Sequence, residues 1–213
     1  MIEIIALLIA GMPLFDSMTL TFGTVGTGGF GLLNSSIASY STAVQIIITV
    51  FMIICSINFT VYYMFLIKRP KEALMCEEMR HYLLIVFGSA LLIAFNIRAS
   101  FASFGKAFQQ AIFQVASVIS TTGFATADFN LWPEFSRMIL VLLMFVGACA
   151  GSTGGGFKVS RLIIMVKSVR NEIMSVTHPR SVQKVHMDGR RIPDNVVKTV
   201  SVLFKFSLSL IHI

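Results

Sequence analysis

Charged residues are scarce in this chain. Asp, Glu, Lys and Arg make up 13% of its 213 residues, whereas 55% are hydrophobic. A soluble domain needs about a quarter charged residues to hydrate its surface. The composition therefore excludes an ordinary soluble domain and predicts a membrane protein.

Cysteine is also scarce. The three cysteines, Cys55, Cys76 and Cys149, lie far apart and form no CxxC pair. This excludes a disulfide framework and a cysteine-based zinc site. The net charge of +7 does not indicate a nucleic-acid partner, because the basic residues gather between apolar stretches.

Long apolar runs are what the chain does contain. The first, residues 43–67, is long enough to cross about 30 Å of hydrocarbon as one tilted helix. A second covers residues 82–97, a third begins near Met138, and a last one covers residues 196–213. These runs predict an all-α polytopic membrane protein.

Most of the Lys and Arg residues lie in two segments, 68–80 and 158–198. Such segments stay on the cytoplasmic side, so the chain between them must go out and return, with residues 98–137 outside. That outer stretch is too apolar for an external loop and too short to cross the membrane twice. It predicts a half-membrane helix that returns as extended chain lining a pore.

A glycine-threonine loop occurs twice in the chain. The sequence "TVGTGGFG", residues 24–31, returns 94 positions later as "VISTTGFA", residues 118–125, and the same shift pairs Gly29 with Gly123. Each copy predicts one unit made of an outer span, a half-membrane helix, a loop and an inner span. The chain is thus expected to repeat a helix, re-entrant pore loop, helix unit, as potassium channels do.

The repeat sets the expected domain organisation. It comprises a pore-loop unit with its outer helix mostly missing, a cytoplasmic loop, a second pore-loop unit with a broken inner helix, another cytoplasmic loop, and the truncated start of a further outer helix. Their ranges are 1–67, 68–80, 81–166, 167–195 and 196–213. The chain is therefore expected to be a fragment.

The repeated loop suits a monovalent cation that sheds its water. Backbone carbonyls supply uncharged oxygen ligands for such an ion. Glycines permit the backbone angles that this needs, and threonines add hydroxyls. These residues are Gly28, Gly29, Gly123, Thr27, Thr121 and Thr122. The half-helices expected over 14–24 and 108–118 aim their C-terminal ends at the cavity, where a dipole of about half a charge favours a cation.

Four segments in order, "FGTVGTGGFGLLNSSI", "SVISTTGFATADFNLWPEF", "GACAGSTGGGFKVSRLI" and "HPRSVQKVHMDGRRI", carry a resemblance. Through them the chain resembles the Trk/Ktr/HKT superfamily of potassium transporters, in particular its TrkH-like membrane subunits. Such proteins carry four pore-loop units in one polypeptide, so the resemblance implies that this chain holds the second and third. The potassium-binding filter positions that it implies are Gly26, Thr27, Gly28, Gly29, Ser120, Thr121, Thr122 and Gly123.

A glycine run interrupts the third apolar stretch. Its motif approaches a phosphate-binding loop, but Phe157 stands where that loop needs lysine. A simple kink or close helix packing is one reading. The other, implied by the resemblance, is a gate loop beneath the filter, and the lack of glycines in the matching residues 55–62 favours it. The candidate gate residues are Gly151, Ser152, Thr153, Gly154, Gly155 and Gly156.

Two residues that follow the loops, Asn34 and Asp128, are candidates for the outer mouth. An acid there draws cations, yet Asp and Asn equally favour local backbone caps. Both readings stay open.

The resemblance also implies the function and the partners. It implies potassium transport across the bacterial cytoplasmic (inner) membrane, with K⁺ as the transported ion, no covalent cofactor and no catalytic residue. Channel-like conduction and coupled symport both remain open. Implied partners are a TrkA-like cytoplasmic nucleotide-binding subunit and a second copy of the full-length chain, and the basic residues also suit anionic lipid.

Two other readings are weighed beside potassium transport. A multi-pass membrane enzyme would need a nucleophile and a base at one membrane depth, and the sequence places no such Ser/His or Asp/His arrangement there. An inactive truncated fragment is the remaining alternative.

Overall fold

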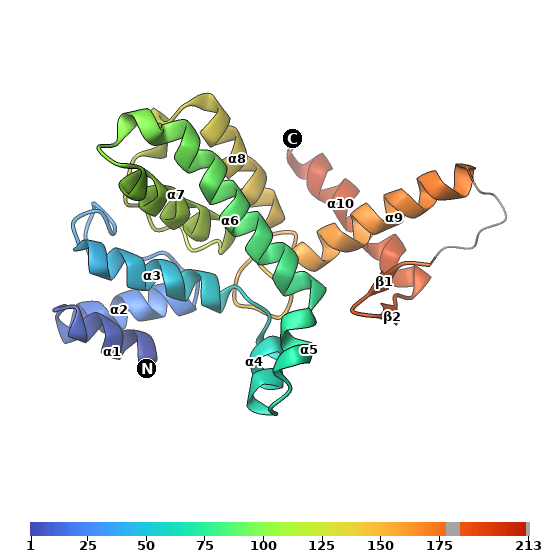
Figure 1. Ribbon diagram of the computed structural model, residues 1–213, viewed down its shortest axis with the longest axis horizontal. Helices are drawn as coiled ribbons and strands as arrows, with labels where there is room; N and C mark the ends of the chain where they lie inside the picture. Colours follow the sequence, from blue (N-terminus) through green and yellow to red (C-terminus); the bar gives the residue numbers. More distant parts are fainter. Residues whose placement is uncertain (178–183, 212–213) are drawn as a thin grey trace.

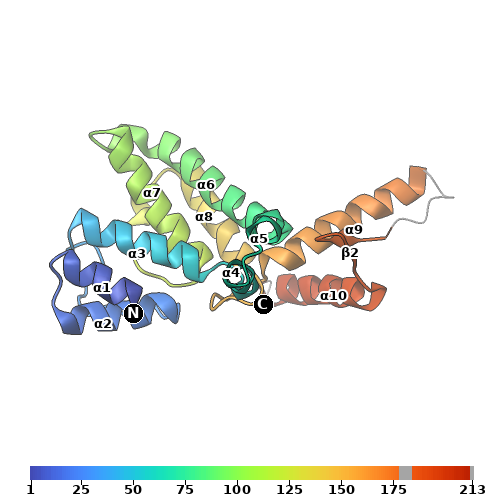
Figure 2. The same cartoon turned by 60° about the horizontal axis from the view of Figure 1, so that its bottom comes forward.

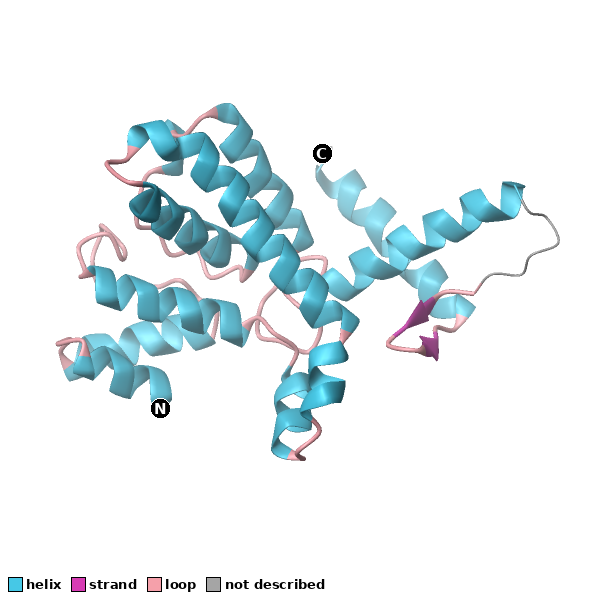
Figure 3. Ribbon diagram, in the orientation of Figure 1, coloured by secondary structure: helices cyan, strands magenta, loops and turns pink. Residues whose placement is uncertain are grey.

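The computed structural model describes residues 1–177 and 184–211, which form helices joined by short loops (Figures 1 and 3). The α-helices are α1 (Ile2–Ile9), α2 (Leu14–Val25), α3 (Thr42–Cys55), α4 (Phe59–Leu66), α5 (Pro70–Met75), α6 (Glu77–Ile97), α7 (Phe104–Ile119), α8 (Glu134–Val146), α9 (Val159–Thr177) and α10 (Asp194–Ile211). Two short 3₁₀-helices are η1 (Arg98–Ser100) and η2 (Phe129–Leu131). The all-α prediction is confirmed.

The two half-helices predicted from the repeat are present as α2 and α7. Ser103 caps the start of helix α7, where its side chain accepts a hydrogen bond from the Lys106 amide, and Ala107 and Ala111 of this helix are fully buried. It packs against α6 and α8 of its own unit and against α3 of the other unit, as Figure 2 shows. Helix α2 packs correspondingly against α1 and α3. The two units therefore contact each other through α3 and α7.

The prediction of one continuous helix over residues 43–67 is wrong. The structure has two helices there, α3 and α4, bent by 88° at a short break. Side chains at the break bond to nearby backbone groups. The Ser56 hydroxyl donates to the Met52 carbonyl, and the Asn58 side chain accepts from the Thr60 amide. These two polar side chains stop one helix and start the next without a glycine.

A second break separates α8 from α9. Residues 147–158 are not helical, and this segment, here called the glycine segment, contains the run expected over 151–156. It begins earlier than the sequence suggested, because Gly147 already takes a positive φ of 69°. Shifted by 94 positions, the break after α3 falls within the glycine segment, so the corresponding helix is interrupted in both units.

The segments expected as cytoplasmic loops carry secondary structure. Residues 68–80 contain α5, which starts with Pro70 in its first turn, and the beginning of α6. Residues 167–195 contain the end of α9, the start of α10 and a hairpin of β1 (His186–Met187) and β2 (Arg190–Arg191). Asp188 and Gly189 form its turn with positive φ, as a two-residue hairpin requires. Of the expected ranges, 178–183 and 212–213 lie outside the described residues.

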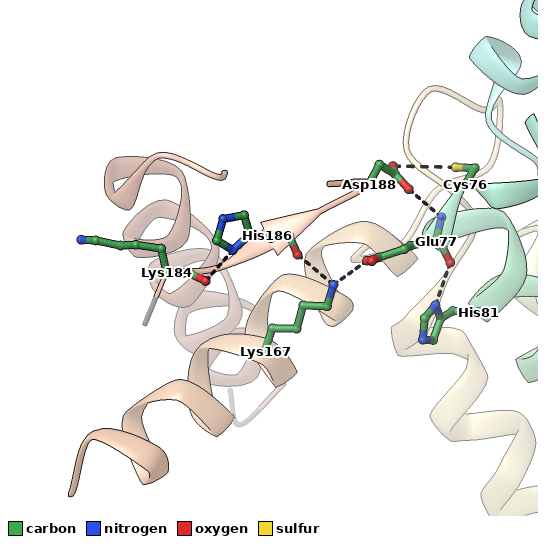
Figure 4. A network of polar contacts seen from close by, with 7 residues as sticks. All are labelled: Cys76, Glu77, His81, Lys167, Lys184, His186 and Asp188. Atoms are coloured by element: carbon green, nitrogen blue, oxygen red, sulfur yellow. Dashed lines mark hydrogen bonds and ion pairs between the residues drawn. The ribbon is translucent and has the colours of Figure 1, made fainter. Parts of the chain in front are cut away.

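The hairpin is fastened to the first turn of α6 (Figure 4). An Asp188 carboxylate oxygen accepts from the Glu77 amide at 2.7 Å. Lys167 of α9 pairs with the Glu77 carboxylate at 2.5 Å and donates to the His186 carbonyl at 2.8 Å. The first turn of α6 thus joins the hairpin to α9.

One described helix is long and apolar enough to cross a membrane, covering Glu77–Ser100. The bent pair of α3 and α4 meets the same criterion when it is taken together. Large apolar side chains on α6 and α8 face outward; they include Leu84, Leu92, Phe95, Met138 and Leu142. Outward apolar faces of this kind suit lipid or neighbouring membrane helices.

Candidate functional site

The loops that follow α2 and α7 have the same backbone conformation. In the first loop, residues 26–29, Thr27 and Gly29 take positive φ of 51° and 66°. In the second loop, residues 120–123, Thr121 and Gly123 take 60° and 88°. A positive φ at every second residue turns successive peptide planes in opposite senses. The repeat seen in the sequence is therefore also a repeat of backbone angles.

The loop amides point back toward the half-helices. In the first loop the amides of Gly28 and Gly29 both donate to the Gly23 carbonyl, at 2.9 and 3.4 Å. In the second, the amides of residues 122 and 123 both donate to the Ser117 carbonyl, at 3.0 and 3.3 Å. Gly23 and Ser117 are themselves 94 positions apart. The pattern of donors is the same in both units.

The loop carbonyls behave differently from the amides. Within the described parts of the chain, the carbonyl oxygens of residues 26–29 and 120–123 accept no hydrogen bond. Backbone carbonyls without a partner are costly away from water unless another group binds them. A dehydrated cation is such a group, because its ligands are uncharged oxygens. These eight oxygens are therefore candidates for binding an ion.

The two loops approach each other closely. A Cβ atom placed on Gly29 would lie 1.9 Å from the Thr122 carbonyl oxygen, which is a severe overlap. No side chain fits at Gly29. At Gly123 a Cβ would meet no described atom within 4 Å, although the φ there is also positive. The first loop thus presses its glycine against the backbone of the second.

The threonine hydroxyls do not all face the same way. The Thr27 hydroxyl donates to the Thr153 carbonyl at 3.2 Å, and the Thr121 hydroxyl accepts from the Gly155 amide at 2.7 Å. The expectation that Thr122 adds a hydroxyl to the ion path is wrong, because this side chain is buried and bonded to Ser120 at 2.7 Å. Two loop threonines therefore contact the glycine segment, and the third packs inside the protein.

The two ends of the glycine segment are hydrogen-bonded to each other, and this contact between residues 146–148 and 155–158 is here called the neck. Backbone bonds join Lys158 to Val146 and Ala148 to Gly155, at 3.0 and 3.3 Å. At the neck a Cβ on Gly147 would lie 2.7 Å from the Gly156 Cα, so only glycines allow the two strands of the neck to meet. The Lys158 ammonium donates to the Gly154 carbonyl within the segment. Sequence reasoning missed Gly147 and Lys158.

The glycine segment also bonds to the break in the other inner helix. The Cys149 amide donates to the Ser56 carbonyl at 3.1 Å, and the Phe59 amide donates to the Gly151 carbonyl at 3.0 Å. The break in residues 55–62 thus exists although that stretch lacks glycine. Both helices are therefore broken. They differ in the length of the break, which is short after α3 and longer after α8.

The structure distinguishes between the two readings of Asp128. Its carboxylate accepts from both the Asn130 amide and the Asn130 side chain, at 2.9 and 2.8 Å. This is a local cap on η2, as the second reading expected. Asn34 is exposed on the surface.

A family model described as TrkH, cation transport protein, matches residues 5–212. The chain is 34% identical over 203 residues to the Trk system potassium uptake protein TrkH of Vibrio parahaemolyticus, and 31% identical over 204 residues to TrkG of Escherichia coli. These alignments cover 92% and 94% of the chain and 42% of each relative. The chain thus spans less than half the length of these relatives.

A solved structure resembles the fold as well. The crystal structure of the potassium transporter TrkH from Vibrio parahaemolyticus superposes with a TM-score of 0.89 at 33% sequence identity. The match covers 95% of this chain and 44% of that one. Nearly every described element therefore has a counterpart in that transporter.

Proposed function

Because the chain belongs to the TrkH family of cation transport proteins, we propose that it conducts potassium ions across a membrane along the carbonyl oxygens of its two loops. The relatives named above are potassium uptake proteins of Trk systems. The observation that carries the proposal is the pair of matched loops whose carbonyls have no hydrogen-bond partner among the described residues. The C-terminal ends of α2 and α7 add a negative dipole end to the same place.

In this proposal the potassium-binding residues are those of the first and second loops, residues 26–29 and 120–123. Each contributes a backbone oxygen and none contributes a formal charge, which lets the ion bind and leave quickly. Two loops supply part of a ring of ligands. We propose that two further loops of the same kind complete it, since the relatives are more than twice as long as this chain.

The glycine segment acts as the gate in this proposal. It is hydrogen-bonded to Thr27 of one loop and Thr121 of the other, so it lies against both loops at once. An ion leaving the loops toward the cytoplasm would meet it. Its anchors to the threonines are single hydrogen bonds, which a conformational change can break at a cost of about 1 kcal/mol each.

The chain acts in the bacterial cytoplasmic membrane, since its relatives come from bacteria and its outward faces are apolar. A TrkA-like nucleotide-binding subunit and a second copy of the full-length chain are the proposed partners. The basic cytoplasmic hairpin and the end of α9 are the described parts that face such a subunit in this arrangement. Transport without covalent chemistry fits relatives that are transporters.

The proposal is tested with a glycine pair. Gly29→Ala is placed in the native gene, and Gly88→Ala on α6, where a Cβ would meet nothing within 4 Å, serves as the matched control. Growth of a potassium-uptake-deficient strain at limiting potassium, and potassium flux into proteoliposomes, are measured. We expect Gly29→Ala to abolish both while Gly88→Ala retains them. Full flux in Gly29→Ala would refute the ion path, and absent flux in the native protein would favour an inactive chain.

A further inference from the structure

Glu78 is a buried acid that the proposed ion path does not use. Its side chain is 2% exposed, and it lies in the first turn of α6. One carboxylate oxygen accepts from the Ala150 amide at 2.6 Å and from the Ser160 amide at 3.2 Å. The other oxygen accepts from the Asn58 side-chain amide at 3.2 Å. Sequence reasoning gave no sign of this residue, because nothing in its local sequence points to the segments it contacts.

These donors explain why a buried carboxylate is tolerated. A buried charge is costly unless hydrogen bonds satisfy it, and no ion pair in the described ranges includes Glu78. Its charge is met by backbone amides instead, one of which belongs to the first turn of α9. A negative charge at that end of a helix is stabilised by the helix dipole.

The three donors come from three separate segments. Ala150 lies in the first half of the glycine segment, and Ser160 follows its end. Asn58 lies in the break between α3 and α4, where its own oxygen accepts from the Thr60 amide. One carboxylate therefore fixes both ends of the glycine segment and joins them to the break in the other inner helix.

We propose that Glu78 is a positioning residue that holds the glycine segment against the two loops. It touches no ion; it acts through the segment, and its consequence for conduction rests on the function proposed above. The neighbouring acid provides a contrast, because the Glu77 carboxylate binds Lys167 and the Glu77 amide donates to Asp188 in the hairpin turn (Figure 4). Two adjacent carboxylates in one helical turn thus have different partners, which makes Glu77 the matched control.

Cys149 reports the position of the segment directly. It lies inside the glycine segment, is fully buried, and precedes Ala150. With Cys55, Cys76 and any cysteine elsewhere in the full-length polypeptide replaced by serine, a water-soluble thiosulfonate reagent labels only Cys149. Loss of a hydrogen bond to a charged group shifts an opening equilibrium by about tenfold or more. We expect Glu78→Ala to speed Cys149 labelling by at least this factor and to raise potassium flux into proteoliposomes, while Glu77→Ala leaves the labelling rate at the native value.

A cysteine placed elsewhere in the fold serves as the control for general unfolding. Ala111 is fully buried in α7, away from the glycine segment, so Ala111→Cys in a background without the native cysteines labels only if the whole fold opens. We expect this position to stay protected when Glu78→Ala is added. Rapid labelling at residue 111 would mean general unfolding and would overturn a role confined to the glycine segment.

Exchanging the donor and the acceptor between Glu78 and Asn58 tests their hydrogen bond in a way that a general loss of stability cannot reproduce. In Glu78→Gln one side-chain oxygen remains for the Ala150 and Ser160 amides, but the new amide group faces the Asn58 amide, donor against donor. Adding Asn58→Asp supplies an acceptor for it and keeps the cap on Thr60. We expect Cys149 labelling to be faster in each single variant and to return to within about twofold of native in the double variant, because the hydrogen bond is restored.

Two outcomes separate this proposal from the function it rests on. If Cys149 labelling stays native in Glu78→Ala while Gly29→Ala still abolishes flux, the ion path stands and the role of Glu78 is refuted. If Glu78→Ala speeds labelling but the native protein conducts no potassium, Glu78 does position the segment and the proposed transport is refuted.

Discussion

The two loops share one backbone but are held in place by different means. In the second loop the Ser120 and Thr122 hydroxyls bond to each other, and the Ser117 hydroxyl donates to the Phe124 carbonyl at 2.6 Å. The positions that match Ser120 and Thr122 in the first loop are Gly26 and Gly28. The first loop therefore has no equivalent side-chain bonds among the described residues.

The same loop conformation is therefore stabilised by different interactions in the two units. The second loop is anchored from behind by buried hydroxyls, each hydrogen bond contributing about 1 kcal/mol. The first loop is held by its amides and by close contact between Gly29 and the backbone of the second loop. A change in the first loop should therefore act through steric contact, and a change in the second through lost hydrogen bonds.

The largest effect is expected from the two loop glycines, Gly29 and Gly123. Both require a positive φ, which costs an alanine about 1–2 kcal/mol, but only Gly29 also faces a backbone atom at 1.9 Å from a new Cβ. We expect Gly29→Ala to abolish potassium flux and Gly123→Ala to reduce it by about tenfold. Flux measurements on both variants in proteoliposomes test this. Equal loss in both would show that φ alone, and not the contact between loops, sets the requirement for glycine.

An intermediate effect is expected from the two threonines that contact the glycine segment. Thr121 accepts from the Gly155 amide at 2.7 Å, whereas Thr27 donates to the Thr153 carbonyl at 3.2 Å. A lost partner for an amide costs about 1–3 kcal/mol, and a carbonyl is more easily satisfied by water. We expect Thr121→Val to speed Cys149 labelling about tenfold and Thr27→Val by about threefold or less. The reverse order would contradict the assignment of donor and acceptor.

The smallest effect is expected from giving the first loop a side chain of the second. Gly28 has ordinary backbone angles, and a Cβ there meets only the exposed Phe30 ring, at 3.3 Å, whereas a Cβ on Gly26 would lie 2.9 Å from the Phe22 carbonyl oxygen. We expect Gly28→Thr to keep potassium flux within about twofold of native, because the exposed Phe30 ring can move aside and one added hydroxyl bond contributes only about 1 kcal/mol. The variant Ser120→Ala, Thr122→Val, which removes the hydroxyl bond of the second loop, should lower the ratio of potassium flux to sodium flux more than Gly28→Thr does. A loss of flux in Gly28→Thr would mean that the first loop accepts no side chain at this position.

Much of this site could be predicted from the sequence. The period of 94 residues located both loops and paired Gly29 with Gly123, which both take positive φ, whereas the positive φ of Thr27 and Thr121 was not predicted. The half-helices over 14–24 and 108–118 were predicted within a few residues of α2 and α7. These features are local, because helix ends and the sign of φ depend mainly on neighbouring residues.

Other parts were wrong or absent because they depend on distant residues. The break at residues 56–58 has no glycine or proline, and its freed backbone groups bond to the glycine segment about 90 positions away. Thr122 was expected to face the ion, but its neighbours Ser117 and Ser120 turn it inward. Glu78 lies in a helical turn whose two acids are alike in sequence, and only the fold gives them different partners.

The sequence by itself determined that the chain is built for a membrane, that it repeats one loop, and which residues in that loop must be glycine. Composition, period and the absence of a Cβ are properties of single residues and their spacing, so no knowledge of the fold is needed. Only the tertiary structure decided that Gly29 contacts the second loop, that the break after α3 bonds to the glycine segment, and that Glu78 joins these two breaks. Each of these depends on groups that lie far apart in the chain, and their contact energies exist only after the helices have packed.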